Sequence, residues 1–296
     1  MKHELIKTGQ APNWHDLLWG DGTPLKDHLN PAAIALFLDI HVKAVTRRIG
    51  LRKYGSTHII DGDQNKLSHQ LGIVGLDADM RAEAYVELIA GCEIHAEGCM
   101  LSCGGKMFDN PIEKTPAGNL TWETIDLAAD CPGAKGILFE VWYEGGGIST
   151  GIRKHGSTDA RVETAMHTWG VVGCDENQLI DWFTRDYAGW KNRLWIVGYI
   201  KGLATFETDA PDITPLVVGS YQTVTVPTPG KLIFLEITSG YVAPSYALRA
   251  SGSAYDEYFD TNYRHNWAMV PANPVGEFEA KVEHARMNIY RVGEGH

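Results

Sequence analysis

One stretch of the chain has the literal spacing of a hydrolase motif. Gly147, Ser149 and Gly151 match the pattern G-x-S-x-G, which in hydrolases places a serine nucleophile on a sharp turn from a strand into a helix. The residues after Ser149 favour a strand instead. We therefore expect no nucleophile elbow and no catalytic residues, and we predict that the protein is not an enzyme.

A second group of residues has side chains that bind soft metal ions. Three thiols and one imidazole fall within twelve residues: Cys92, His95, Cys99 and Cys103. Thiolates and imidazoles are the usual zinc ligands, but residues three apart in a strand project to opposite faces. We expect free thiols without a disulfide, since five cysteines are an odd number in a chain of 296 residues. We predict no metal and no other cofactor, and keep these four as the candidate zinc ligands.

Oxygen ligands also alternate in one loop. Asp61, Asp63 and Asn65 are spaced as in calcium-binding loops. The glycine and the distal glutamate of an EF-hand are missing, and Asx-rich turns are common without a metal. We expect a solvated turn, with calcium as the alternative.

Aromatic residues outside the core pattern are candidates for ligand binding. Rings exposed in loops stack on sugars or fill protein interfaces, and the same rings are also common in cores. The candidates are Trp142, Tyr143, Trp182 and Trp190.

These candidates are positioned by a sequence that repeats itself three times. A short apolar strand with a phenylalanine recurs at Ala35–Ile40, Ile137–Val141 and Leu232–Ile237. The phenylalanines Phe37, Phe139 and Phe234 are separated by steps of 102 and 95 residues. One repeat therefore has about 100 residues, and three repeats account for the chain.

Further signals recur in the same order. A tryptophan or tyrosine precedes each phenylalanine at Trp19, Trp122 and Tyr221, and Thr115-Pro116 is echoed by Thr214-Pro215. Each repeat then has an arginine before a Gly-Ser turn and a histidine before an apolar strand: Arg52, Arg153 and Arg249, then His69, His167 and His265. A polar residue in such a place is most often a hydrogen-bonded part of the framework, so we expect framework roles.

Within each repeat the apolar runs are short and rich in β-branched and aromatic residues, with turn residues every 8 to 12 positions. This pattern indicates an all-β protein of three tandem antiparallel β-sandwich domains, jelly-roll-like, of about 100 residues each. We predict the domains at residues 1–105, with an N-terminal arm, 106–205 and 206–296.

Composition and charge restrict the partners. The net charge is −11, which disfavours binding to nucleic acid. No apolar run approaches the length of a membrane span, so we expect no membrane insertion. The N-terminus lacks the basic and apolar regions of a secretion signal. We expect folding in a cytoplasm.

The second repeat carries a resemblance. Its runs Phe139–Val141, Gly151–Arg161, Gly173–Asn177 and Ile196–Tyr199 resemble a β-sandwich repeat of structural proteins of tailed phages and related viruses, found in tail, fibre and capsid-surface proteins. The first repeat fits fairly and the third loosely, with Ala250 and Pro271 in place of Lys and Gly. The resemblance brings no catalytic residues.

The resemblance implies a non-enzymatic virion structural protein, such as a capsid decoration, collar or tail component, with host attachment as a further role. The implied partners are capsid or tail subunits, copies of the same chain, or a host surface glycan. The protein would fold in the host cytoplasm and reside in the virion. The alternative is a carbohydrate-binding protein that uses loop aromatics or calcium.

Overall fold

The computed structural model is all-β apart from one 3₁₀ turn, η1 (Leu25–Asp27), among the residues it describes. It describes residues 4–7, 13–42, 47–60, 62–64, 68–87, 92–118, 120–143, 148–165, 167–185, 192–227, 231–240, 245–254, 259–261 and 264–295. Within these ranges, no helix has the length and apolar character needed to cross a membrane.

The strands fall into three units that follow one another along the chain. The first unit contains β1 (Glu4–Lys7), β2 (Trp14–Asp16), β3 (Leu18–Trp19), β4 (Ala33–Val42), β5 (Arg47–Lys53), β6 (Gly62–Gln64), β7 (Ser68–Gly75), β8 (Ala82–Val86) and β9 (Cys92–Leu101). The second contains β10 (Gly105–Glu113), β11 (Trp122–Asp126), β12 (Gly136–Tyr143), β13 (Ile148–Lys154), β14 (Glu163–Ala165), β15 (Thr168–Gly173), β16 (Leu179–Thr184) and β17 (Asn192–Ile200). The third contains β18 (Ala204–Phe206), β19 (Gln222–Thr225), β20 (Leu232–Ser239), β21 (Ser245–Ala250), β22 (Phe259–Thr261), β23 (His265–Pro271), β24 (Glu277–Val282) and β25 (Met287–Gly295).

Each unit pairs its strands in the same order. In the second unit one sheet has the order β10-β17-β12-β15 and the other β11-β16-β13-β14. The third unit repeats these orders with β18-β25-β20-β23 and β19-β24-β21-β22, and the first with β1-β9-β4-β7 and β2-β8-β5-β6. A short parallel pairing of β22 with β7 joins the third unit to the first. The chain therefore repeats one two-sheet topology three times.

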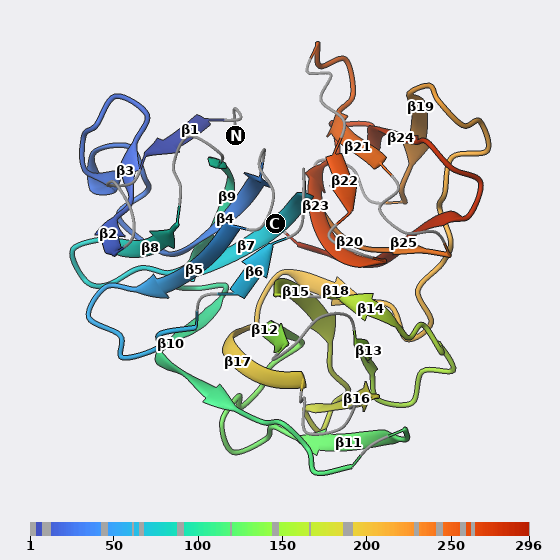
Figure 1. Cartoon of the computed structure of the whole chain (residues 1–296), viewed down its shortest axis with the longest axis horizontal. Coiled ribbons are helices and arrows are strands. Elements are labelled where there is room, and N and C mark those ends of the chain that lie inside the picture. The colour runs from blue at the N-terminus through green and yellow to red at the C-terminus, as the bar shows by residue number, and fades with distance from the viewer. Residues whose placement is uncertain are drawn as a thin grey trace.

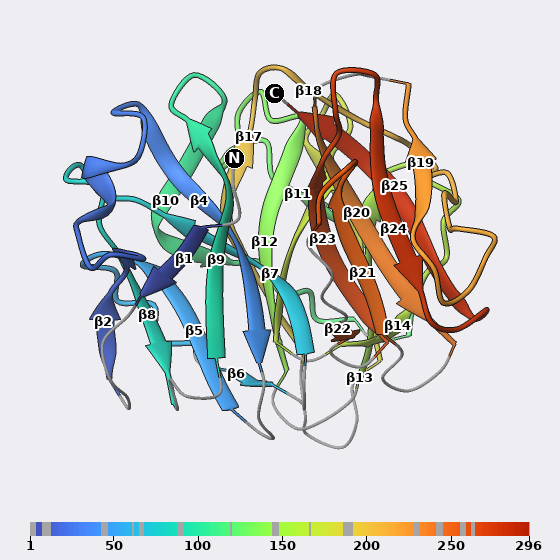
Figure 2. The ribbon, with the colours of Figure 1, turned by 90° about the horizontal axis from the view of Figure 1, so that it is seen from above.

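The three units surround a common centre (Figure 1). Strands β7, β15 and β23, each the last in its unit's first sheet, contact one another there. In the side view the long strands of all three units run from one end of the molecule toward the other (Figure 2). We call the sheets that contain these three strands the central sheets. The three units are thus arranged with approximate threefold symmetry around the centre (Figure 1).

The central strands are buried on both faces. All residues of β15 are buried, as are those of β4 except Ile34. In contrast, β8 and β24 alternate between buried and partly exposed residues, as expected of sheets with one face toward solvent. Continuous apolar runs in the sequence therefore mark the strands nearest the centre.

The hydrophobic core does not divide into three. One cluster of buried residues extends from Ile6 to Val292 and takes in residues of all three units. A second lies within the third unit, from Val224 to Ile289. The first cluster includes residues on both sides of positions 105 and 205, so the core is not divided at these positions. The domain boundaries there remain a prediction from the sequence repeat.

The structure corrects the alignment of the phenylalanines. Phe37 and Phe234 pair with Gly98 and Gly293, and the equivalent pair in the second unit is Leu138 with Gly198. Directly after each of these pairs the register shifts by a β-bulge. Phe139 therefore lies one position beyond the equivalent of Phe37, a one-residue slip that a shared residue type concealed.

The recurring arginines lie in the second sheet of each unit. Arg52, Arg153 and Arg249 each bond to an acid on the neighbouring strand, respectively Glu83, Asp181 and Glu279. Each guanidinium also stacks on an aromatic ring, and these rings belong to Trp14, Trp122 and Tyr221. The counterpart of Trp122 is therefore Trp14, and the alignment with Trp19 is wrong.

Two smaller repeated signals have matching hydrogen bonds. The hydroxyls of Thr115 and Thr214 accept hydrogen bonds from the backbone N–H groups of Leu194 and Ile289 at 3.0 and 2.8 Å. These equivalent bonds confirm that Thr115-Pro116 and Thr214-Pro215 are repeated positions.

The Ser-Thr turns after β5 and β13 are held by side-chain oxygens from the next unit. Asn110 accepts from Ser56 and Thr57, and Asp209 accepts from Ser157 and Thr158.

Gly170 allows two units to pack closely, and its substitution tests that packing. A Cβ at this position would meet the ring of Phe139 and lie 2.7 Å from the indole of Trp267; these rings pack edge to face at 5.0 Å. We expect Gly170→Ala to lower the free energy of unfolding by about 1–3 kcal/mol through overpacking, measured by urea denaturation.

Gly98→Ala is the matched control. Gly98 is also a buried strand glycine, but a Cβ there would be 3.8 Å from its nearest neighbours, Leu232 and Phe37. We expect little or no loss of stability. Equal losses in both variants would contradict the role of Gly170.

Candidate functional site

The central sheets bury one carboxylate in each unit. Asp39 lies on β4, Glu140 on β12 and Glu236 on β20, with exposed fractions of 7%, 0% and 1%. The three positions are equivalent, because they pair with Leu71, Trp169 and Trp267 on the neighbouring strands. A charge removed from water in this way needs partners that compensate its lost hydration.

Glu140 is bound by histidines from two units. One carboxylate oxygen lies 2.6 Å from Nε2 of His167, which precedes β15 in the same unit. The other lies 2.7 Å from Nε2 of His58, which follows the Ser-Thr turn of the first unit. Burial by itself would raise the pKa of Glu140, but the hydrogen bonds from His167 and His58 outweigh it and lower that pKa.

Glu236 forms the equivalent contact between the second and third units. Its carboxylate lies 2.7 Å from Nε2 of His265, which begins β23, and 2.7 Å from Nη2 of Arg161. Arg161 also pairs with Asp159 at 2.9 Å and stacks on the ring of Tyr290. Burial opposes ionisation of Glu236, but His265 and Arg161 lower its pKa.

Asp39 lies where the third unit meets the first. Its carboxylate is 2.7 Å from Nε2 of His41, two residues along β4. Tyr246 of the third unit is close enough that burial and the charge of Asp39 together raise the pKa of its phenol. The three carboxylates therefore lie at three successive contacts between units, which we call the seams.

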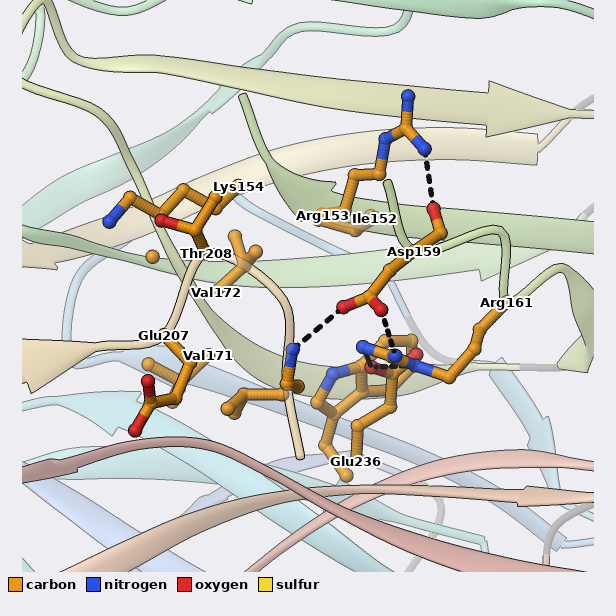
Figure 3. Close-up of a pocket in the computed structure, with 14 residues that line it drawn as sticks. Ile152, Arg153, Lys154, Asp159, Arg161, Val171, Val172, Glu207, Thr208 and Glu236 are labelled. Atoms are coloured by element: carbon orange, nitrogen blue, oxygen red, sulfur yellow. Dashed lines mark hydrogen bonds and ion pairs between the residues drawn. The ribbon is translucent and has the colours of Figure 1, made fainter. Parts of the chain in front are cut away.

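A small cavity lies at the seam between the second and third units (Figure 3). Its volume of about 20 Å³ is enough for about one water molecule. Figure 3 shows Asp159 beside Arg161, with which it forms an ion pair. The backbone N–H of Ala210 donates to the other oxygen of Asp159 at 2.9 Å. Of the charged groups in its lining, Asp159, Arg161 and Glu236 bind one another. The cavity is too small for an organic substrate.

A larger hollow of about 340 Å³ lies in the third unit. Pro215, Leu216, Val218 and Met287 form its apolar part, and His284 is its histidine. Asp212, also in its lining, accepts hydrogen bonds from Thr214. Thr214 has the one side-chain hydroxyl of the described lining, and this hydroxyl donates to Asp212 and accepts from the backbone N–H of Ile289.

The candidate stacking residues are mostly buried. Trp182 is 1% and Tyr143 is 8% exposed, so neither ring offers a face to a sugar. Trp142 is partly exposed and lies 6.2 Å from the ring of Trp195. Trp190 lies outside the described residues.

The four candidate zinc ligands do not come together. Cys92, His95 and Cys99 are spread along β9 opposite Val42, Asp39 and Leu36, and Cys103 is an exposed residue beyond the strand. A strand rises about 3.3 Å per residue, which keeps Cys92 and Cys99 far apart. All five cysteines are free, and burial raises the pKa of Cys92 to about 12, which disfavours the thiolate that binds metals.

The other predicted motifs are placed as follows. Ser149 lies inside β13, paired with Thr164, so the turn from strand to helix that a nucleophile elbow needs is not present there. Asp63 lies in β6 opposite Arg48. Asp61 and Asn65 lie outside the described residues.

A different group of side chains that could hold a metal ion includes one of the predicted ligands. Ligand atoms of His41, Glu93 and His95 lie within 4.8 Å of one another, the one such group found among the described residues. The sequence did not indicate this group, because His41 is 54 positions from His95 and only strand pairing brings them together.

His58 and Arg161 were also missed. Each lies a few residues after a repeated Gly-Ser-Thr turn. That shared position is the one feature of the sequence that indicates a common role. Their partners Glu140 and Glu236 lie 82 and 75 residues further along the chain. Contacts of this range cannot be predicted without knowing how the units are arranged.

Removing Arg161 should destabilise the protein strongly. Arg161→Met leaves Glu236 buried with one fewer cationic partner, and breaking a buried ion pair in this way costs about 3–5 kcal/mol. As a control, Arg193→Met removes a surface pair with Glu113, whose side chains are 35% and 44% exposed; about 0–1 kcal/mol is expected. Equal effects in urea unfolding would contradict a special role for the seam.

The seam carboxylates should also make stability depend on pH. Because the folded state lowers the pKa of Glu140 and Glu236, their contribution is fully present above the ordinary glutamate value of 4.5 and is lost as pH falls through the folded pKa. Urea unfolding between pH 3 and 7 should show this loss for the wild type and a weaker dependence for Glu140→Gln. Parallel curves would exclude the assignment.

Comparisons with known proteins give the chain no family. No protein-family model matches it, and a search of curated proteins finds no match.

Proposed function

We propose that this chain is a non-enzymatic structural protein of a virion, a capsid decoration, collar or tail component, built from three tandem jelly-roll-like sandwiches. The observation that carries the proposal is the identical strand order of the three units. Numbering the eight shared strands along a unit, the orders are 1-8-3-6 and 2-7-4-5, and these orders support the jelly-roll interpretation. Such folds are common in viral capsid proteins and in lectins.

The threefold arrangement supports a role in assembly. Three similar units around one centre (Figure 1) present similar surfaces at intervals of a third of a turn. A symmetric particle offers repeated surfaces of matching symmetry, so a single copy could contact several capsid or tail subunits at once. Buried ion pairs at the seams favour a block with fixed geometry.

The alternative is carbohydrate binding, which would serve host attachment. It is favoured by the lectin use of jelly rolls and by Trp142, the partly exposed ring among the described candidates. Fold by itself does not choose between these functions, so each needs its own experiment.

Electron microscopy of the source particle tests the structural function. We expect ordered copies of a three-lobed density at symmetric positions, with the chain present among the proteins of purified particles. Absence of the chain from purified, infectious particles would refute the proposal.

A glycan array tests the alternative. The structural proposal predicts no sugar-specific binding by the wild type. Binding that is lost in Trp142→Ala and retained in Trp19→Ala, a control ring that stacks on His28, would favour the carbohydrate-binding function instead.

A further inference from the structure

We propose that His41, Glu93 and His95 form a binding site for a divalent transition metal ion of the zinc class on the first unit, with Asp39 as a positioning residue. This inference goes beyond the proposed function and does not depend on it. The site differs from the cysteine-rich set that the sequence suggested and shares with it only His95.

Strand pairing places the four side chains on one face of the central sheet. His41 on β4 is directly opposite Glu93 on β9, and Asp39 is directly opposite His95. Residues two apart on a strand share a face, and so do residues opposite one another in an antiparallel pair. The four side chains therefore occupy the corners of one small rectangle.

The distances suit a metal ion after a small adjustment. The ligand atoms of His41, Glu93 and His95 lie within 4.8 Å of one another. Zinc bonds of about 2.0–2.2 Å to nitrogen and oxygen place tetrahedral ligands about 3.3–3.5 Å apart. Side-chain rotations that move the ligand atoms by about an ångström would close this difference.

The environment provides both support and access. The side chains of His41, His95 and Glu93 have exposed fractions of 2%, 14% and 39%. His41 is therefore at the buried end of the site, and Glu93 is at the end that opens to solvent. Asp39 holds Nε2 of His41 at 2.7 Å, which would direct Nδ1 to the metal. Carboxylate–histidine pairs of this kind orient metal-binding imidazoles in many proteins.

The sister units show that the fold does not require these residues. The positions equivalent to Asp39, His41, Glu93 and His95 are Glu140, Trp142, Arg193 and Trp195 in the second unit. In the third unit they are Glu236, Thr238, Asn288 and Tyr290. Only the buried acid is shared, so the two histidines and Glu93 are a special feature of the first unit.

The donor set selects the metal. Two imidazoles and one carboxylate are the ligands of open zinc sites, which keep a fourth position for water. Imidazole nitrogen suits zinc and its neighbours, whereas calcium and magnesium prefer oxygen ligands throughout. We therefore expect Zn²⁺ and Co²⁺ to bind and Mg²⁺ and Ca²⁺ to bind weakly.

Titration of the chelator-treated full chain with ZnCl₂ in a calorimeter tests the site, with Co²⁺ absorption as a second readout of tetrahedral coordination. We expect one ion per chain in the wild type, binding lost in His95→Gln and Glu93→Gln, and binding weakened about 10- to 100-fold in Asp39→Asn. His155→Gln, which removes a histidine paired with Asp181 elsewhere, should bind as the wild type does.

Two results would overturn the site. One is the absence of Zn²⁺ binding by the wild type. The other is binding that persists unchanged in both ligand variants. If His95→Gln does not fold, Glu93→Gln decides, because Glu93 is the most exposed of the three ligands. Neither result affects the virion proposal.

Discussion

Burial of one carboxylate in each central sheet is the constraint on which the three-unit arrangement depends. An ionised acid away from water is tolerated only with well-placed partners. Glu140 and Glu236 each take one partner from their own unit and one from the unit before, His58 or Arg161. Separation of the units would remove from each of these carboxylates the partner that the unit before supplies. The ion pairs at the seams therefore hold neighbouring units together. The sequence repeat alone would suggest that each unit is a separate domain.

The repeat, the all-β class and the short strands could be predicted from the sequence, because hydrophobic periodicity and turn residues act locally. The framework role of His167 followed from the same reasoning. Register could not be fixed, because a shared residue type concealed that Phe139 lies one position beyond the equivalent of Phe37. In the same way, the spacing of Trp19 from Phe37 concealed that Trp14 is the true counterpart of Trp122. The seam partners and the His41–Glu93–His95 group depend on strand pairing between distant segments, which local patterns do not encode.

The shared core explains how three similar units can behave as a single body. Trp267 of the third unit packs against Phe139 and Gly170 of the second, and one apolar cluster extends through all three units. Each unit then differs where it is free to differ. The first has two histidines where the second has a tryptophan pair and the third has Thr238 and Tyr290. A common scaffold thus carries separate local chemistry on each unit.

The claim that the units form one cooperative body is tested most directly by differential scanning calorimetry of the full chain. The account predicts a single transition whose calorimetric and van't Hoff enthalpies agree, as for a two-state unit. Three separable transitions, or a calorimetric enthalpy about three times the van't Hoff value, would show independent domains and contradict it.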